Sequence, residues 1–423
     1  MTGAPGGTAD VGASSETAGV GTAGETADVE AIQWESLDGN RRLASRRTKA
    51  FVGVVGLVVA AFLYDYLVVP AGEPTVEWWD VSLLDWLFLL SLAVFAFYVV
   101  VPLARKPRMT RHYWRQLRSD WLATASFAYV CLFFLAGLFG PILAEPLRDY
   151  MLANDPGYLG MSTKQPPVGF ARYVTQPSLC AGPVTNNMCQ GTWLHPLGTT
   201  VAGQDVALSI LRGSRVALQI ALITSMLVVP LATVVGTVAA HFGGRVDEAL
   251  MRYVDVQQAV PAFFVYLIAR ALYSDVELVL LILIFGLLNW GGIARLVRSE
   301  ALQTSEAQYV QAARSAGSSR LQVVRRHLVP NVSSTMVTAV TLQIPTLIII
   351  ETTLSFLELG PISDYESWGY LIRGAMHSGH FPTWLWWQSG STIVVLVLTT
   401  VSFNVLGDAL RDVLDPRVEG VSA

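Results

Sequence analysis

Long apolar stretches alternate with shorter polar ones along most of this chain. A membrane-spanning helix needs about 20 mainly apolar residues to cross roughly 30 Å of hydrocarbon. The first candidate stretch is interrupted by Asp65 near one end, and the fifth contains Pro261 and Arg270. The pattern predicts an all-α integral membrane protein with about eight transmembrane helices, at residues 51–69, 86–104, 121–143, 216–241, 255–273, 276–295, 332–357 and 384–407.

Composition supports this prediction and separates the ends of the chain from the rest. Hydrophobic residues make up 52% and charged residues 14% of the sequence, which excludes an ordinary soluble domain. Residues 1–40 are rich in Gly, Ala, Thr and Ser and contain seven acidic and no basic residues. We expect residues 1–48 to form a disordered acidic tail with a basic end, and 418–423 to form a short C-terminal tail. The first apolar run begins only at Phe51, so the N-terminus does not resemble a secretory signal.

Basic residues in short loops predict the orientation, because such loops stay cytoplasmic. The turn at 70–80 has acidic residues and no basic one. We therefore expect a multi-pass protein of the cell membrane with both termini in the cytoplasm, an extracytoplasmic loop at about 144–207 and a cytoplasmic loop at about 297–331. The basic residues before the first span and between the second and third are Arg41, Arg42, Arg46, Arg47, Lys49, Arg105, Lys106, Arg108, Arg111, Arg115 and Arg118.

Two of the three cysteines fall in the predicted extracytoplasmic loop. Cys180 and Cys189 are close in sequence and could form a disulfide in an oxidising compartment. The alternative is two free thiols. Cys131 lies in an apolar span, where we expect it to pack.

The cytoplasmic loop contains SEAQYVQAARSAGSSRLQVVRRHLVPN, residues 305–331. Residues 306–316 favour a helix that Gly317 ends in a left-handed conformation, and Ser319 followed by Gln322 has the form of a capping box. A second helix would place Leu321, Val324 and Leu328 on one face and end at Pro330. This helix–turn–helix is suited to docking in a groove, although an ordinary basic loop would show the same pattern.

Parts of this loop resemble a known family. QAARSAG and RRHLVPN look like the cytoplasmic loop of ABC-importer permeases, in which Glu-Ala-Ala is followed after three residues by Gly and later by an apolar stretch ending in Pro. Here Gln311 replaces the Glu. LGTTVAGQDVALSILRGSRVAL, ETTLSFLELG and FNVLGDALRDVLDPR are similar to permeases of the dipeptide and oligopeptide type. Thr200 and Gln204 depart from the Asp and Arg usual there, so an ionic role at those positions is not carried over.

The resemblance covers about residues 120–417 and implies a domain plan. Residues 119–417 would form a six-helix permease core, and residues 49–118 an extra transmembrane hairpin with a basic cytoplasmic loop. Peripheral packing or an assembly role is the expected use of this hairpin.

The resemblance also implies partners and a mechanism. The chain would pair with a second homologous permease as a heterodimer, and two cytoplasmic ABC ATPase subunits would bind ATP and Mg. An extracytoplasmic binding protein would deliver a peptide or similar small solute. The residues implied in ATPase coupling are Gln311, Ala312, Ala313, Arg314, Gly317, Ser319, Gln322, Arg325, Arg326 and Pro330.

The chain's own residues predict no catalytic site. A phosphate-binding loop needs Gly-Lys, and no lysine here follows a glycine, so ATP hydrolysis is assigned to partner subunits. We expect no metal, no cofactor bound by this chain and no nucleic-acid partner. Glu351 lies inside a span and is predicted either to line the translocation path or to make a structural hydrogen bond. Pro261 is predicted to kink its helix, at a bend in the path or in ordinary packing.

Two other classes of membrane protein are alternatives to an importer. An ion-gradient-driven secondary transporter would need a cluster of carboxylates at the bilayer midplane and inverted repeats. A membrane-embedded hydrolase would need a nucleophile and a base, or clustered metal ligands, at one depth. The sequence has one deep carboxylate and scattered histidines, which favours neither alternative.

Overall fold

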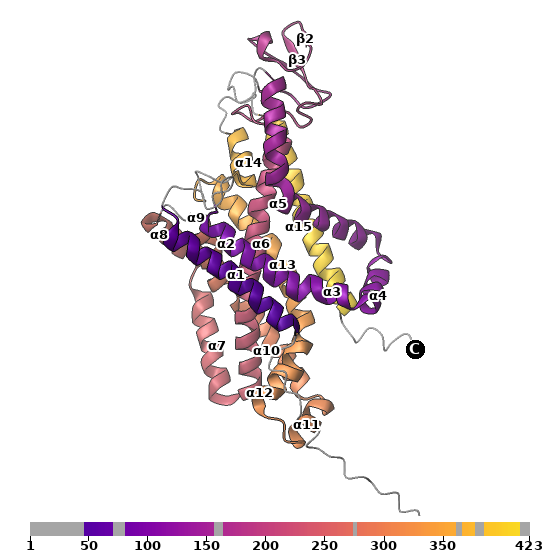
Figure 1. The fold of residues 1–423 in the computed structure, drawn as a ribbon, viewed down its shortest axis with the longest axis vertical. Coiled ribbons are helices and arrows are strands. Elements are labelled where there is room, and N and C mark those ends of the chain that lie inside the picture. The colour runs from indigo at the N-terminus through magenta and orange to yellow at the C-terminus, as the bar shows by residue number, and fades with distance from the viewer. Residues whose placement is uncertain are drawn as a thin grey trace, which may run out of the picture. The chain divides into compact units, whose positions relative to one another are not determined.

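A computed structural model describes residues 46–70, 81–155, 164–273, 277–360, 366–376 and 385–414. The predicted acidic tail and C-terminal tail lie almost entirely outside these ranges. Helices dominate, which confirms the all-α fold class (Figure 1). In chain order the elements are α1 (Arg46–Val68), α2 (Leu83–Phe95), η2 (Ala96–Val100), α3 (Val101–Arg105), α4 (Pro107–Leu117), α5 (Trp121–Asn154), β1 (Ala171–Tyr173), η3 (Pro177–Leu179), β2 (Val184–Thr185), β3 (Met188–Gln190), α6 (Val206–Phe242), α7 (Gly244–Ala259), α8 (Ala262–Leu272), α9 (Glu277–Leu288), α10 (Gly291–Ser305), α11 (Gln308–Ser315), α12 (Arg320–Val323), η5 (Val324–Leu328), α13 (Val329–Phe356), α14 (Trp368–Met376) and α15 (Trp386–Leu414).

Seven helices of the described residues are long and apolar enough to cross a membrane, one fewer than the sequence predicts. The difference lies at the fifth predicted span, 255–273. Val260 and Pro261 are both extended there, and they separate α7 from the short α8. A residue before proline avoids the helical region, so the expected kink at Pro261 is a complete break.

Side-chain pairings show that α7 and α8 nevertheless return the chain across the bundle. Gly286 packs against Leu227 and Gly236 against Val297, so α6 and the α9–α10 span run parallel. A parallel pair requires a crossing between them. The pairing of Asp247 with Arg298, and of Tyr266 with Phe285, runs in the antiparallel sense along α7–α8. The predicted fifth crossing is therefore made by two short helices.

The helix α6 is the centre of the bundle and packs against α5, α10, α13 and α2. Its contact with α5 is close because Gly137 has no side chain: a Cβ there would lie 2.7 Å from Cδ2 of Leu218. Two further spans, α13 and α15, pack together; α13 also packs against α6, and α15 against α5. The largest fully buried side chains of the bundle include Leu218, Ile220, Ile223, Ile282, Ile348 and Trp368.

The N-terminal hairpin packs one face of α2 against the bundle. Leu84 and Phe88 of α2 are each only 1% exposed. The Asp85 carboxylate accepts a hydrogen bond from Arg215 of α6 at 3.0 Å, and the Arg215 guanidinium lies 4.4 Å from the centre of the Phe88 ring. The first helix, α1, has no buried residue in its most apolar window. Only 11% of the most apolar window of Leu83–Arg105 is buried, so the expectation of peripheral packing fits both helices, with one face of α2 packed against α6.

The two ends of the spanning helices carry different structural elements. We call the end that carries the β-strands the sheet end and the end that carries α11 the loop end. Beyond the expected span, α5 continues to Asn154, and α6 begins at Val206 instead of 216. Between them lies a small antiparallel sheet with strand order β1-β3-β2. We call residues 164–205 the outer module.

Candidate functional site

The segment 305–331 at the loop end forms the predicted helix, turn and second helix. Gly317 has a φ of +85°, a conformation that glycine adopts without strain. The backbone N–H of Ser318 donates to the carbonyl of Ala313, and that of Gly317 to the carbonyl of Arg314. This pair of bonds is the Schellman motif that ends many helices. The prediction for Gly317 is confirmed.

The second half of the segment begins as predicted and continues differently. The Ser319 side chain accepts a hydrogen bond from the Gln322 backbone N–H at 3.3 Å and so caps α12. Pro330 does not end this helix, because it lies in the first turn of α13, and the helix continues to Phe356. A π-helical turn, η5, precedes the proline. Leu328 is itself helical, so Pro330 lies within one continuous helix, and the π-helical turn is the irregularity that accompanies its missing N–H and its ring.

The same π turn changes which residues face inward. Val323, Leu328 and Val332 are fully buried, whereas Leu321 is 73% exposed. A π turn adds a residue per turn, so the buried stripe passes from Leu328 back to Val323, two residues from Leu321. Val324 and Leu328 are buried and Leu321 is exposed, so the prediction that the three share one face is wrong for Leu321.

Most of the candidate coupling residues lie on the surface of this segment. Gln311, Ala312 and Arg314 of α11 are exposed, as are Gly317 and Ser319 in the turn, while Ala313 is half-buried. The side-chain amide of Gln311 donates to the Glu306 carbonyl at 3.0 Å. A surface hollow of about 320 Å³ is lined by Gln322, Arg325 and Arg326. Together with exposed Leu321 these groups form a mixed apolar and cationic surface.

The segment 305–331 packs against the ends of the spanning helices. Val310 of α11 and Val323 of α12 are both fully buried. The guanidinium of Arg320 lies 5.9 Å from the centre of the Phe242 ring at the end of α6. The segment thus packs one side against the bundle and leaves the other side exposed.

Two ion pairs that sequence reasoning missed join α10, which leads into the segment, to α7. Arg298 donates two hydrogen bonds of 2.5 Å to the Asp247 carboxylate, and Arg295 pairs with Asp255 at 2.5 Å. The partners are about 40 to 50 residues apart in sequence, so no local spacing indicates them.

The two predicted path residues lie in different surroundings. The Glu351 carboxylate is 2% exposed and accepts a hydrogen bond from the Ser355 hydroxyl at 2.7 Å, one turn along α13. Pro261 is exposed at the start of α8. A shallow hollow between α6 and α13, lined in part by Thr224, Ser225 and Gln343, contains neither of them.

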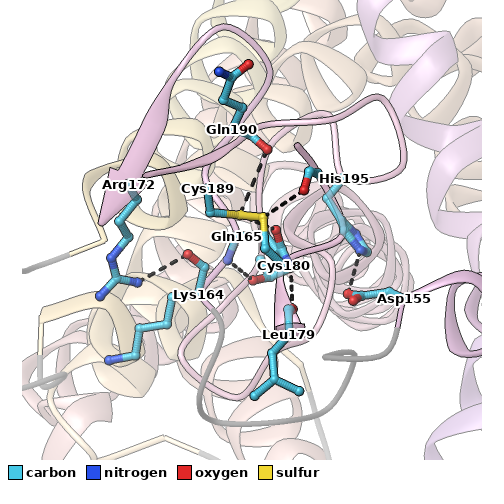
Figure 2. Close-up of a disulfide and its surroundings, with 11 residues drawn as sticks. Asp155, Lys164, Gln165, Arg172, Leu179, Cys180, Cys189, Gln190 and His195 are labelled. Atoms are coloured by element: carbon cyan, nitrogen blue, oxygen red, sulfur yellow. Dashed lines mark hydrogen bonds and ion pairs between the residues drawn. A yellow bond between two sulfur atoms is a disulfide. The ribbon is translucent and has the colours of Figure 1, made fainter. Parts of the chain in front are cut away.

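At the sheet end, Cys180 and Cys189 form a disulfide, which confirms that pairing over two free thiols (Figure 2). The bond holds β3 to the loop after η3. The Trp387 indole N–H of α15 donates to the Thr199 carbonyl, and the Gln388 side chain accepts from the Val201 N–H. The outer module is therefore fastened to the start of α15.

A buried histidine fastens the outer module to two more helices. The two ring nitrogens of His195 lie 3.0 Å from Asp155, at the end of α5, and 2.9 Å from Asp205, which caps α6. Figure 2 shows the Asp155 contact beside the disulfide. Burial alone would lower the pKa of His195, but the hydrogen bonds and charges of both aspartates raise it to about 9. Sequence reasoning missed this arrangement.

These features define a class: a multi-pass α-helical membrane protein with an exposed, glycine-hinged helix pair between two core spans. Residues 232–420 match the family described as the inner membrane component of binding-protein-dependent transport systems. The dipeptide transport system permease protein of Bacillus subtilis is 32% identical over 227 residues, which cover 53% of this chain and 69% of the relative. The oligopeptide transport system permease proteins of Haemophilus influenzae and Escherichia coli K12 are 30% and 31% identical, covering 53% of this chain and 70% and 72% of the relatives.

The chain therefore belongs to the family of binding-protein-dependent transport system inner-membrane components. Its members are translocation subunits of ABC importers and work with an ATPase and a binding protein. This assignment supports the importer interpretation and not the ion-gradient-driven alternative. The hairpin α1–α3 and the helices α4 and α5 precede the residues that the family model matches.

Proposed function

We propose that this chain is a permease subunit of a peptide importer and that the segment 305–331 couples it to a cytoplasmic ATPase. The observation that carries the coupling role is an exposed leucine, Leu321, beside a hollow lined by Arg325 and Arg326. An exposed leucine beside cationic side chains offers a protein partner both an apolar contact and an opposite charge. Packing around the hinge would supply affinity, and the basic rim would speed association.

The packing around the segment supports a route for the movement. Any displacement of α11 and α12 pulls on α10 at one side and on α13 at the other, because the chain enters and leaves through them. Both helices pack on α6. The ion pairs of Arg295 and Arg298 join α10 to α7, so α7 would move with it. ATP-driven closure of the ATPases would in this way shift the spans around the path.

The proposed cargo and assembly follow from the relatives. Their names state dipeptide and oligopeptide transport, and we extend a peptide or similar small solute to this chain. A second homologous permease would complete the path as a heterodimer, with two ATPase subunits and an extracytoplasmic binding protein. We place the chain in the cell membrane with both termini in the cytoplasm.

Substitution of Gly317 tests the coupling role. At a φ of +85° a valine is strained by about 1–3 kcal/mol, and a Cβ at this position meets nothing within 4 Å, so Gly317→Val acts through the backbone alone. We expect it to abolish most solute uptake and reduce ATPase co-purification while the protein still inserts. Gly317→Asn is the matched control, since asparagine tolerates this conformation. Uptake by the valine variant equal to that of the asparagine variant contradicts the proposal.

A further inference from the structure

The helix α4 connects two membrane spans at the loop end and carries an unusual density of positive charge. It follows α3 after a sharp turn at Lys106, where the Thr110 hydroxyl donates to the Leu103 carbonyl at 2.7 Å. Three residues separate the end of α4 from the start of α5. Because both neighbours are spans, α4 is held within a few residues of the membrane surface.

The residues of α4 divide into two faces. At 100° per residue, Met109, Tyr113 and Leu117 fall on one side, and Leu117 is buried. Trp114 lies between this side and the arginines; it is partly exposed and packs against Phe127 of α5, with ring centres 5.5 Å apart. Apolar and aromatic groups on one face suit the boundary between headgroups and acyl chains.

The opposite face is basic. Arg108, Arg111, Arg115 and Arg118 fall within an arc of about 80° of the helix circumference, and Arg105 and Lys106 precede them; all six are exposed. Among the described residues, no carboxylate lies within ion-pair distance of any of these six side chains. Mutual repulsion of this many like charges is relieved when anions lie nearby.

We propose that α4 lies in the plane of the membrane surface and that its basic face binds the headgroups of anionic phospholipids. The position of α4 between two spans brings its arginines to headgroup depth without any further partner. Basic side chains near the membrane surface attract anionic headgroups. Each such side chain raises the local concentration of anionic lipid by a several-fold factor. Arginine also forms bidentate hydrogen bonds to phosphate.

Lipid binding at α4 has a consequence for the hairpin. The helix is joined directly to α3, and it contacts α15. Anionic lipids bound at α4 would keep the loop ends of the hairpin and of α5 at the same depth in the membrane. This inference does not depend on the proposed coupling role of the segment 305–331.

The test uses the full chain in nanodiscs, with Cys131→Ser and Ser119→Cys to carry one fluorescent donor next to α4. Acceptor-labelled phosphatidylglycerol or phosphatidylcholine is added in trace amounts. We expect energy transfer to report about threefold or greater enrichment of phosphatidylglycerol, lost in the variant Arg108→Gln, Arg111→Gln, Arg115→Gln and at high salt. The variant with lysine at the same three positions should keep it.

A matched control neutralises Arg245 and Arg252, two exposed arginines of α7, and should leave the enrichment unchanged. Equal transfer to both lipids in the unsubstituted chain overturns the proposal. Enrichment that survives the glutamine substitutions also overturns it, because the lipid then binds elsewhere. If those substitutions reduce ATPase co-purification and not lipid enrichment, the basic face binds protein and the proposal is wrong.

Discussion

His195 shows how one side chain can hold three parts of this protein together. It lies in the outer module, it is fully buried, and its two ring nitrogens contact aspartates at the ends of α5 and α6. Both contacts are strongest when the ring is protonated, because both partners are acids. The imidazolium therefore bridges the ends of two spans that also pack directly on each other through Ala144, Met151 and Leu208.

The pKa of His195 predicts a pH dependence. Its folded value of about 9 exceeds the ordinary 6.5, so the folded state binds the proton more tightly. The stabilisation is complete below about pH 6.5, declines as the pH rises and is lost above about pH 9, an effect on the order of 3 kcal/mol at most. We expect hydrogen-exchange protection of residues 199–208, corrected for intrinsic rates, to fall over this range. His195→Gln should remove the pH dependence; an equal slope in both proteins would refute the assignment.

At the scale of elements, α2 is the hairpin helix that is built into the bundle. Its acidic residue, Asp85, reaches Arg215 and Gln219 of α6, and Trp86 donates to Asp65 of α1 at 2.9 Å. Removing the hairpin would expose the buried face of α2's partner and leave Arg215 without its carboxylate. A chain that starts near Leu103 is therefore expected to insert with less stability than the intact protein.

A double-mutant cycle tests this ion pair. Arg215→Met leaves the carboxylate of Asp85 largely buried without its cation, and we expect a loss of about 1–3 kcal/mol. The double variant Asp85→Asn, Arg215→Met should recover most of that loss, because neither charge is left unpaired. Thermal unfolding in nanodiscs gives the measurement. Additive losses in the double variant would show that the pair does not join α2 to α6.

At the scale of the whole spanning bundle, the two ends of the helices have different functions in our interpretation. The outer module with its disulfide lies at the sheet end, and the candidate coupling segment and α4 lie at the loop end. This arrangement agrees with the orientation expected from basic residues, which places the loop end in the cytoplasm.

Cysteine labelling from outside intact cells tests that orientation. In a Cys131→Ser background, an impermeant reagent should react with Thr192→Cys in the outer module and not with Ser318→Cys beside Gly317. Disrupting the cells should make Ser318→Cys reactive, which serves as the control for an accessible thiol. Reaction of Ser318→Cys in intact cells would reverse the topology and remove the basis for ATPase coupling.

Features that depend on neighbouring residues are predictable from the amino-acid sequence alone. Apolar stretches of sufficient length predict spans because each helix satisfies its own backbone hydrogen bonds. The turn at Gly317 and the cap at Ser319 are likewise visible, since their hydrogen bonds reach only three to five residues. Pro261 also indicates that the fifth span is weak. The sequence predicts a kink there, whereas the structure has a break between α7 and α8.

Features that join distant residues depend on how the helices pack and are visible only in the folded protein. Asp85 and Arg215 are 130 residues apart, and His195 and Asp155 are 40 apart; packing brings them together, and no periodicity records it. The exposure of Leu321 depends on the π turn η5, because the residues of that turn which pack against the bundle determine which side of the helix is buried. Local chemistry specifies which helices form, whereas the partner of each buried charge is set by which helices pack against each other.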